Sequence, residues 1–131
     1  MKRQATTIEN SRTTAPDTVV TDEAEDIYQL MNLPPRMTGL PMVVWVSQRG
    51  NARHDVRIKV NMTHGRQMRI ENIAVVAVRP NPRVVAGQLT SEDRDGVFAW
   101  VKLNQETLVA YWDDNIDTGQ FLEQLKLLPA S

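Results

Sequence analysis

The residues with the clearest chemical potential lie between His54 and Arg66. His54 precedes a segment in which Arg57 and Lys59 alternate with apolar residues, and His64 follows at the next turn. A histidine can move a proton near neutral pH while neighbouring cations hold a phosphate group. Metal-independent cleavage of RNA needs little beyond such an acid–base group and cationic stabilisation of the transition state. His54 and His64 are therefore the candidate catalytic residues, although ordinary turn residues are the simpler interpretation of both.

A metal site is a less favoured interpretation of the same stretch. His54, Asp55 and His64 are suitable ligand types for zinc or manganese, but their spacing across a turn is not diagnostic. Asp113 and Asp114 lack the glycine and the terminal glutamate of a calcium loop, and helix capping explains them better. The chain has no cysteine and no glycine-rich phosphate loop, so we expect neither a metal nor a cofactor.

The charges are strongly segregated along the chain. Among the 131 residues, 15 are basic and 16 are acidic, which gives a net charge of −1. Residues 49–83 hold eight basic and two acidic residues (+6), residues 1–48 hold four and six (−2), and residues 84–131 hold three and eight (−5). Seven of the eight central basic residues are arginine, which binds phosphate or carboxylate bidentately. The predicted binding residues are Arg53, Arg57, Lys59, Arg66 and Arg69.

Hydrophobic periodicity predicts the strands that must position these side chains. Residues 55–62 alternate between apolar and polar types, which predicts a half-buried strand with a basic face towards solvent. The run at 73–78 is continuously apolar and predicts a central strand that is covered on both faces. The segments 42–46, 67–70 and 84–89 are also expected to be extended.

Helical spacing replaces strand patterns after residue 90. Thr90 is a plausible N-cap, and Asn104 resembles a second one, so we expect two helices that meet at Asn104 or one kinked helix. A last helix is expected from Asp117 to Leu128, with Pro129 after it. The tryptophans Trp45, Trp100 and Trp112 are natural anchors of one core.

These elements predict an α+β domain over residues 42–131, an antiparallel β-meander of about four to five strands packed against C-terminal helices. Residues 1–20 are polar and lack periodicity, which predicts a disordered tail. Residues 21–41 are expected to form a short helix at 22–32 and a proline-rich connection.

The helix pair at residues 97–112 supports a resemblance. It contains Trp100-Val101, Asn104, Leu108 and Trp112, and it follows a strand beginning with His54 and a Gly-Gln-Leu turn. Over roughly residues 42–114, this layout resembles small bacterial domains of unknown function that are often encoded in toxin–antitoxin-like gene pairs. The chain lacks the Pro-Pro-His lead-in of those domains. The resemblance implies the fold and a bacterial cytoplasmic context, but no activity.

Two functions follow from these observations. The favoured one is a non-enzymatic interaction domain whose basic sheet face binds an acidic protein segment, including the chain's own residues 22–32, or a nucleic-acid backbone. The alternative is a toxin-like, metal-independent ribonuclease that uses His54 or His64 with Arg57, Lys59 and Arg66. Internal neutralisation of the basic region by the acidic ends is the simplest explanation of the charge pattern.

Further features of the sequence narrow the expected setting. Residues 49–83 contain no Phe, Tyr or Trp, which argues against base stacking and leaves phosphate contact as the nucleic-acid binding mode. No apolar run is long enough to cross a membrane. The first ten residues lack the apolar stretch of a secretory signal, so we expect a cytoplasmic protein.

Overall fold

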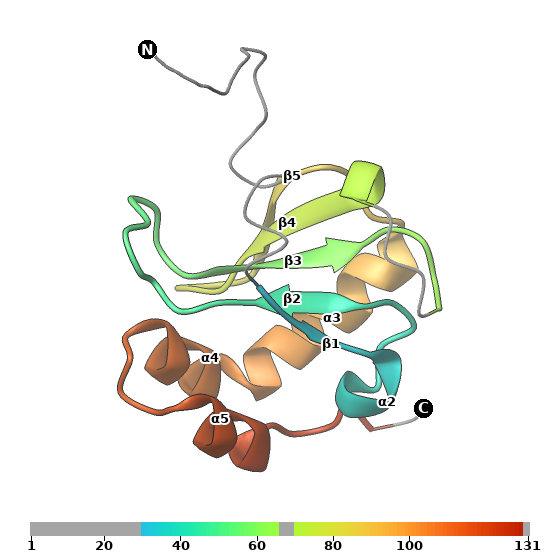
Figure 1. Cartoon of the computed structure of the whole chain (residues 1–131). Helices are drawn as coiled ribbons and strands as arrows, with labels where there is room; N and C mark the ends of the chain where they lie inside the picture. Colours follow the sequence, from blue (N-terminus) through green and yellow to red (C-terminus); the bar gives the residue numbers. More distant parts are fainter. Residues whose placement is uncertain (1–29, 66–69, 130–131) are drawn as a thin grey trace, which may run out of the picture.

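The chain forms a five-stranded antiparallel sheet with helices against one face, as a computed structural model shows (Figure 1). The structure describes residues 30–65 and 70–129. Neighbouring strands in the sheet are also consecutive in the chain, which makes the sheet a meander and confirms the predicted α+β class. The strands are β1 (Met31–Leu33), β2 (Val44–Val46), β3 (Arg57–Asn61), β4 (Ile73–Ala77) and β5 (Arg83–Ala86).

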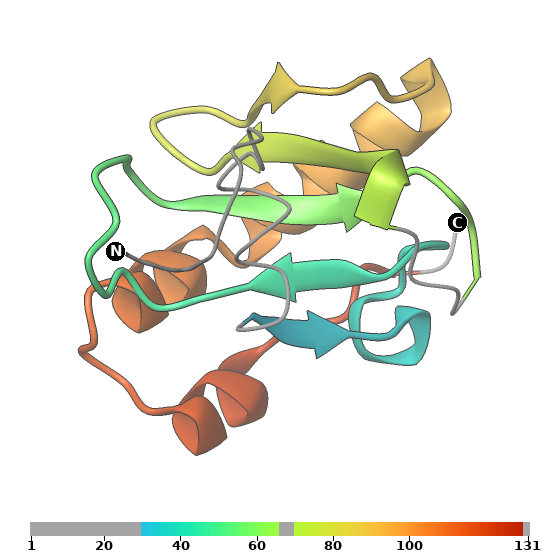
Figure 2. The same cartoon turned by 45° about the horizontal axis from the view of Figure 1, so that its top comes forward.

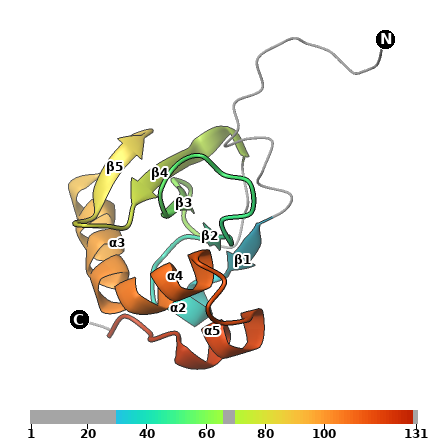
Figure 3. The ribbon, with the colours of Figure 1, turned by 90° about the vertical axis from the view of Figure 1, so that its left-hand side faces the viewer.

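Three helices cover one face of this sheet, as Figures 2 and 3 show from two directions. They are α3 (Ser91–Leu103), α4 (Gln105–Trp112) and α5 (Thr118–Gln124). A four-residue helix, α2 (Pro35–Thr38), follows β1, and the 3₁₀ helix η2 (Ile70–Asn72) precedes β4.

The register of the strands divides their side chains between the two faces. Val44 pairs with Val60, and both belong to the main core under the helices. The next pair, Trp45 with Lys59, points to the opposite face because successive strand residues alternate. Trp100 and Trp112 lie in the main core, whereas Trp45 packs with Val43 in a second cluster. The prediction of one core for all three tryptophans is therefore wrong.

Asn104 separates α3 from α4, as the sequence predicts, but it does not cap α4 with its side chain. Its amide nitrogen donates to the carbonyl oxygens of Trp100 and Lys126, each at 3.1 Å. Its amide oxygen accepts from the backbone N–H of Lys126 at 2.8 Å. The side chain thus binds the C-terminal segment instead of starting a helix.

The predicted N-cap Thr90 and the predicted start of the last helix at Asp117 are confirmed. The hydroxyl oxygen of Thr90 accepts from the backbone N–H of Asp93 at 3.1 Å. Asp117 and Gln120 form a reciprocal capping box at the start of α5. This helix ends at Gln124 instead of Leu128, and Leu128 lies in an extended segment whose N–H donates to the Thr38 carbonyl oxygen at 2.8 Å.

Several predicted boundaries change. The predicted helix 22–32 is wrong at Met31 and Asn32, which lie in β1 because they pair with β2, and its first part lies outside the described residues. Residues 31–33 belong to the sheet because they pair with β2. The α+β domain therefore begins before residue 42, the start that the sequence predicts. The predicted tail 1–20 and most of the predicted extended segment 67–70 also lie outside the described residues.

Candidate functional site

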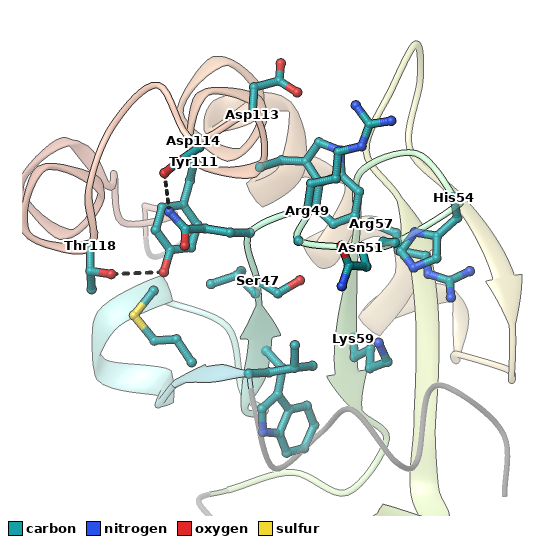
Figure 4. A pocket seen from close by; sticks show the side chains of 18 of the residues that line it. Ser47, Arg49, Asn51, His54, Arg57, Lys59, Tyr111, Asp113, Asp114 and Thr118 are labelled. Atoms are coloured by element: carbon teal, nitrogen blue, oxygen red, sulfur yellow. Dashed lines mark hydrogen bonds between the residues drawn. The ribbon is translucent and has the colours of Figure 1, made fainter.

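A hollow of about 1410 Å³ lies between the connection from β2 to β3 and the end of α4 (Figure 4). We call it the basic hollow because four cations line it, against two carboxylates, a net charge of +2 when histidine is neutral. Its charged residues are Arg49, Arg53, Arg57, Lys59, Asp113 and Asp114. Figure 4 shows the two carboxylates on the helical side and Arg57, Lys59 and His54 on the sheet side.

Contacts with α4 hold the connection from β2 to β3 in place. The backbone N–H of Arg49 donates to the carbonyl oxygen of Trp112 at 3.0 Å. The side-chain amide of Gln48 donates to a carboxylate oxygen of Asp114 at 2.9 Å. The N–H of Ala52 donates to the Arg49 carbonyl oxygen at 2.8 Å and closes a turn. This connection therefore presents its arginines from a fixed backbone.

The cations of the basic hollow differ in their access to solvent. Arg49 and Arg53 are exposed, and neither takes part in an ion pair within the described part of the chain. Arg57 is half-buried, and Lys59 is only 5% exposed. The two exposed arginines are thus the groups best placed to meet a ligand.

The predicted solvent-facing side of β3 is wrong over its second half. Lys59 is buried and Asn61 has no exposed surface, although both side chains point away from the three helices. Alternation along a strand assigns a side chain to a face, but it does not say whether that face meets water. Of the predicted binding residues, Arg53, Arg57 and Lys59 line the basic hollow, and Arg66 and Arg69 lie outside the described residues.

His54 lines the basic hollow and stacks on Trp112. The two ring centroids are 5.4 Å apart, and the ring planes are inclined by 29°. Nδ1 of His54 lies 2.8 Å from the backbone carbonyl oxygen of Asp55, so this nitrogen donates a hydrogen bond to it. The ring is partly exposed, whereas Trp112 is 2% exposed.

His64 lies beyond the other end of β3 from His54. Five extended residues at about 3.3 Å each place roughly 17 Å of strand between the two histidines. Nε2 of His64 is 2.8 Å from a carboxylate oxygen of Asp93, whose side chain is nearly buried at the start of α3. The structure therefore does not bring the two candidate catalytic histidines together.

Asp55 is engaged with Arg79 instead of with a histidine. The guanidinium donates to both carboxylate oxygens, at 2.9 Å from Nη2 and 3.0 Å from Nε. The side-chain hydrogen bond from Arg79 lowers the pKa of Asp55, with help from the backbone N–H of Val56. Within residues 30–65 and 70–129, no group of three His, Asp or Glu side chains is arranged to hold a metal ion.

Sequence reasoning missed Arg49, Trp112 and Asp114 as residues of this site. Arg49 was visible as part of the basic region, but nothing local shows that it contacts α4. Trp112 and Asp114 come from the far end of the chain, and only the packing of α4 beside the β2–β3 connection brings them to the hollow.

Together, the fold and the site define a small α+β domain with an arginine-lined hollow at one end of its sheet. No family model, no curated protein and no solved structure matches this chain. No helix in the described part of the chain is long and apolar enough to cross a membrane.

Proposed function

We propose that this protein is a non-enzymatic interaction domain whose basic hollow binds the phosphate backbone of a nucleic acid. The observation that carries the proposal is the pair of exposed arginines, Arg49 and Arg53, on a connection fixed to α4. Guanidinium groups make bidentate, charge-assisted hydrogen bonds to phosphate oxygens. Arg57 lies deeper in the same hollow and adds a third such group.

An acidic protein segment is the competing ligand for these cations. The hollow also offers the partly exposed ring of His54, which an acidic side chain does not need and a nucleotide can use. The His54 ring therefore favours a nucleic acid as the ligand. Preferential binding of an acidic peptide is one possible outcome of the test below.

The ribonuclease alternative gains less support. His54 and His64 cannot act together on one phosphate, because β3 separates them, so each would have to act with the cations alone. The Nε2 atom of His64 is also engaged by Asp93. Incubation of RNA with the protein and with His54→Ala tests this alternative, and cleavage by the parent that is lost in the variant would support it.

Fluorescence anisotropy with a labelled single strand of about 12 nucleotides tests the proposal. With about three phosphate contacts, raising salt from about 50 to about 200 mM is expected to weaken binding roughly 20-fold. The double variant Arg49→Ala, Arg53→Ala removes two contacts and should flatten this salt dependence.

The matched control is Arg83→Ala, Arg94→Ala, which removes the same charge at a separate shallow hollow beside β5. It should bind nearly as the parent does. Equal losses of oligonucleotide affinity in both double variants would contradict the proposal. Tighter binding of a glutamate peptide than of an oligonucleotide of the same charge would contradict it as well.

A further inference from the structure

We propose that the ring of His54 is a stacking platform for an unpaired base, so that the basic hollow takes single-stranded nucleic acid in preference to duplex. This inference rests on the proposed function, because it adds a base contact to the phosphate contacts. It names the form of nucleic acid that the site recognises.

The His54 imidazole packs against a buried side chain and also borders the hollow. One face packs on the indole of Trp112, at a centroid distance of 5.4 Å and an inclination of 29°. Trp112 is buried in the main core under the sheet, so it supports the ring and does not meet a ligand itself. His54 is partly exposed and lines the hollow.

A hydrogen bond holds the His54 ring in one orientation. Donation from Nδ1 to the Asp55 carbonyl oxygen, 2.8 Å away, fixes the plane of the imidazole. The Asp55 carboxylate in turn accepts hydrogen bonds from Nε and Nη2 of Arg79. A platform fixed in this way loses little conformational freedom on binding, which favours affinity.

Arginine side chains share the hollow with the His54 ring. Arg53 is adjacent in sequence, and Arg49 and Arg57 line the same hollow as His54. A stacked base brings its flanking phosphates close to the ring, where these guanidinium groups can bind them. Single-strand sites combine stacking rings and cations in this way, and stacking tolerates any base because every base has a π-face.

A stacking ring favours single strands over duplex. Bases within a duplex have both faces covered by their neighbours, so a stacking platform cannot reach them without unpairing. The absence of Phe, Tyr and Trp from residues 49–83 argued against stacking, but Trp112 supplies the supporting ring from outside that region. The proposed platform is a histidine, a residue type that the prediction against stacking did not count.

Anisotropy titrations with three labelled ligands test the inference: an oligonucleotide of mixed sequence, an abasic strand of the same length and the matching duplex. The parent should bind the mixed strand at least about 5-fold more tightly than the abasic strand. His54→Ala should bind both strands equally, at the affinity of the parent for the abasic strand. His54→Phe restores a stacking ring and should recover the preference.

Equal binding of mixed and abasic strands by the parent, or a preference for duplex, would overturn the stacking role. A preference that survives in His54→Ala would overturn it as well. Salt-sensitive binding of the abasic strand would still support the proposed phosphate site, whereas no binding of any ligand would contradict both proposals. Urea unfolding of each variant confirms that the compared proteins are folded.

Discussion

Asn104 binds both the N–H and the carbonyl group of Lys126, and in this way it fastens the C-terminal segment to the junction of α3 and α4. The side chain of Asn104 is only 2% exposed, and its amide nitrogen also donates to the carbonyl oxygen of Trp100. Replacement of this asparagine therefore tests how much the C-terminal segment contributes to the domain.

Asn104→Ala is expected to lower the free energy of unfolding by about 2–3 kcal/mol, because it removes the three hydrogen bonds that the buried amide makes to Trp100 and Lys126. Urea unfolding followed by circular dichroism measures the change. Asn115→Ala is the matched control, since Asn115 is exposed, and it should change stability by less than about 0.5 kcal/mol. Equal midpoints for the two variants would contradict the role assigned to Asn104.

Gly87 is expected to tolerate no side chain. Its φ is +78°, and an added Cβ would lie 2.8 Å from both the Cα of Ala74 and the carbonyl oxygen of Ile73. Gly87→Ala combines an unfavourable backbone conformation with a clash against β4, and should destabilise the protein by roughly 3 kcal/mol.

Gly65 separates these two effects in a control variant. Its φ is +91°, but no atom of the residues that the structure describes lies within 4 Å of the position that an added Cβ would occupy, so Gly65→Ala is expected to carry the backbone cost alone. Its destabilisation should be smaller than that of Gly87→Ala in the same urea experiment. If Gly65→Ala destabilised the protein more than Gly87→Ala does, close packing against β4 would not be the reason that residue 87 must be glycine.

Thr90→Ala removes the N-cap of α3. The backbone N–H of Asp93 then loses its acceptor, and the expected cost is about 1 kcal/mol. Ser91→Ala serves as the comparison, because Ser91 is exposed in the first turn and alanine is well accepted there. Thermal unfolding should show a lower midpoint for Thr90→Ala only.

The Asp55–Arg79 pair predicts a small dependence of stability on pH. Its hydrogen bond lowers the pKa of Asp55 below the ordinary value of 3.8. A carboxyl whose pKa is lowered by folding stabilises the folded state above its unfolded pKa, and this contribution is lost as the pH falls through the folded pKa. Asp55→Asn should therefore be slightly less stable than the parent at neutral pH and equally stable in strong acid.

Both side chains of this pair are substantially exposed, so the effect should be small and should shrink further in high salt. Urea midpoints for the parent and Asp55→Asn across the acid range measure it. A difference that grows as the pH falls would contradict the assigned direction of the pKa change.

The strands that carry β-branched runs were predictable because their pattern is local. Val75, Val76 and their neighbours form a continuous apolar run, and β4 is indeed interior in the sheet with both faces buried. β1 was not predictable in the same way. Leu30 and Met31 follow Ile27 at helical spacing, and only pairing with β2 makes Met31 extended.

The functional site shows the same limit of local patterns. Three of the four cations of the basic hollow, Arg53, Arg57 and Lys59, could be predicted because basic residues cluster in the sequence near His54. The stacking of His54 on Trp112 could not, since it depends on α4 packing beside the β2–β3 connection. The burial of Lys59 was equally hidden, because strand alternation does not reveal what covers a face.

An NMR titration with the mixed single strand tests the central claim most directly, because it locates the bound ligand on the protein. Backbone amide shifts are expected to change most between Ser47 and Arg57, and the indole N–H of Trp112 should shift with them. Amides near Arg83 and Arg94 should stay unchanged. Changes confined to the region of Arg83 and Arg94, or no changes at low salt, would contradict binding in the basic hollow.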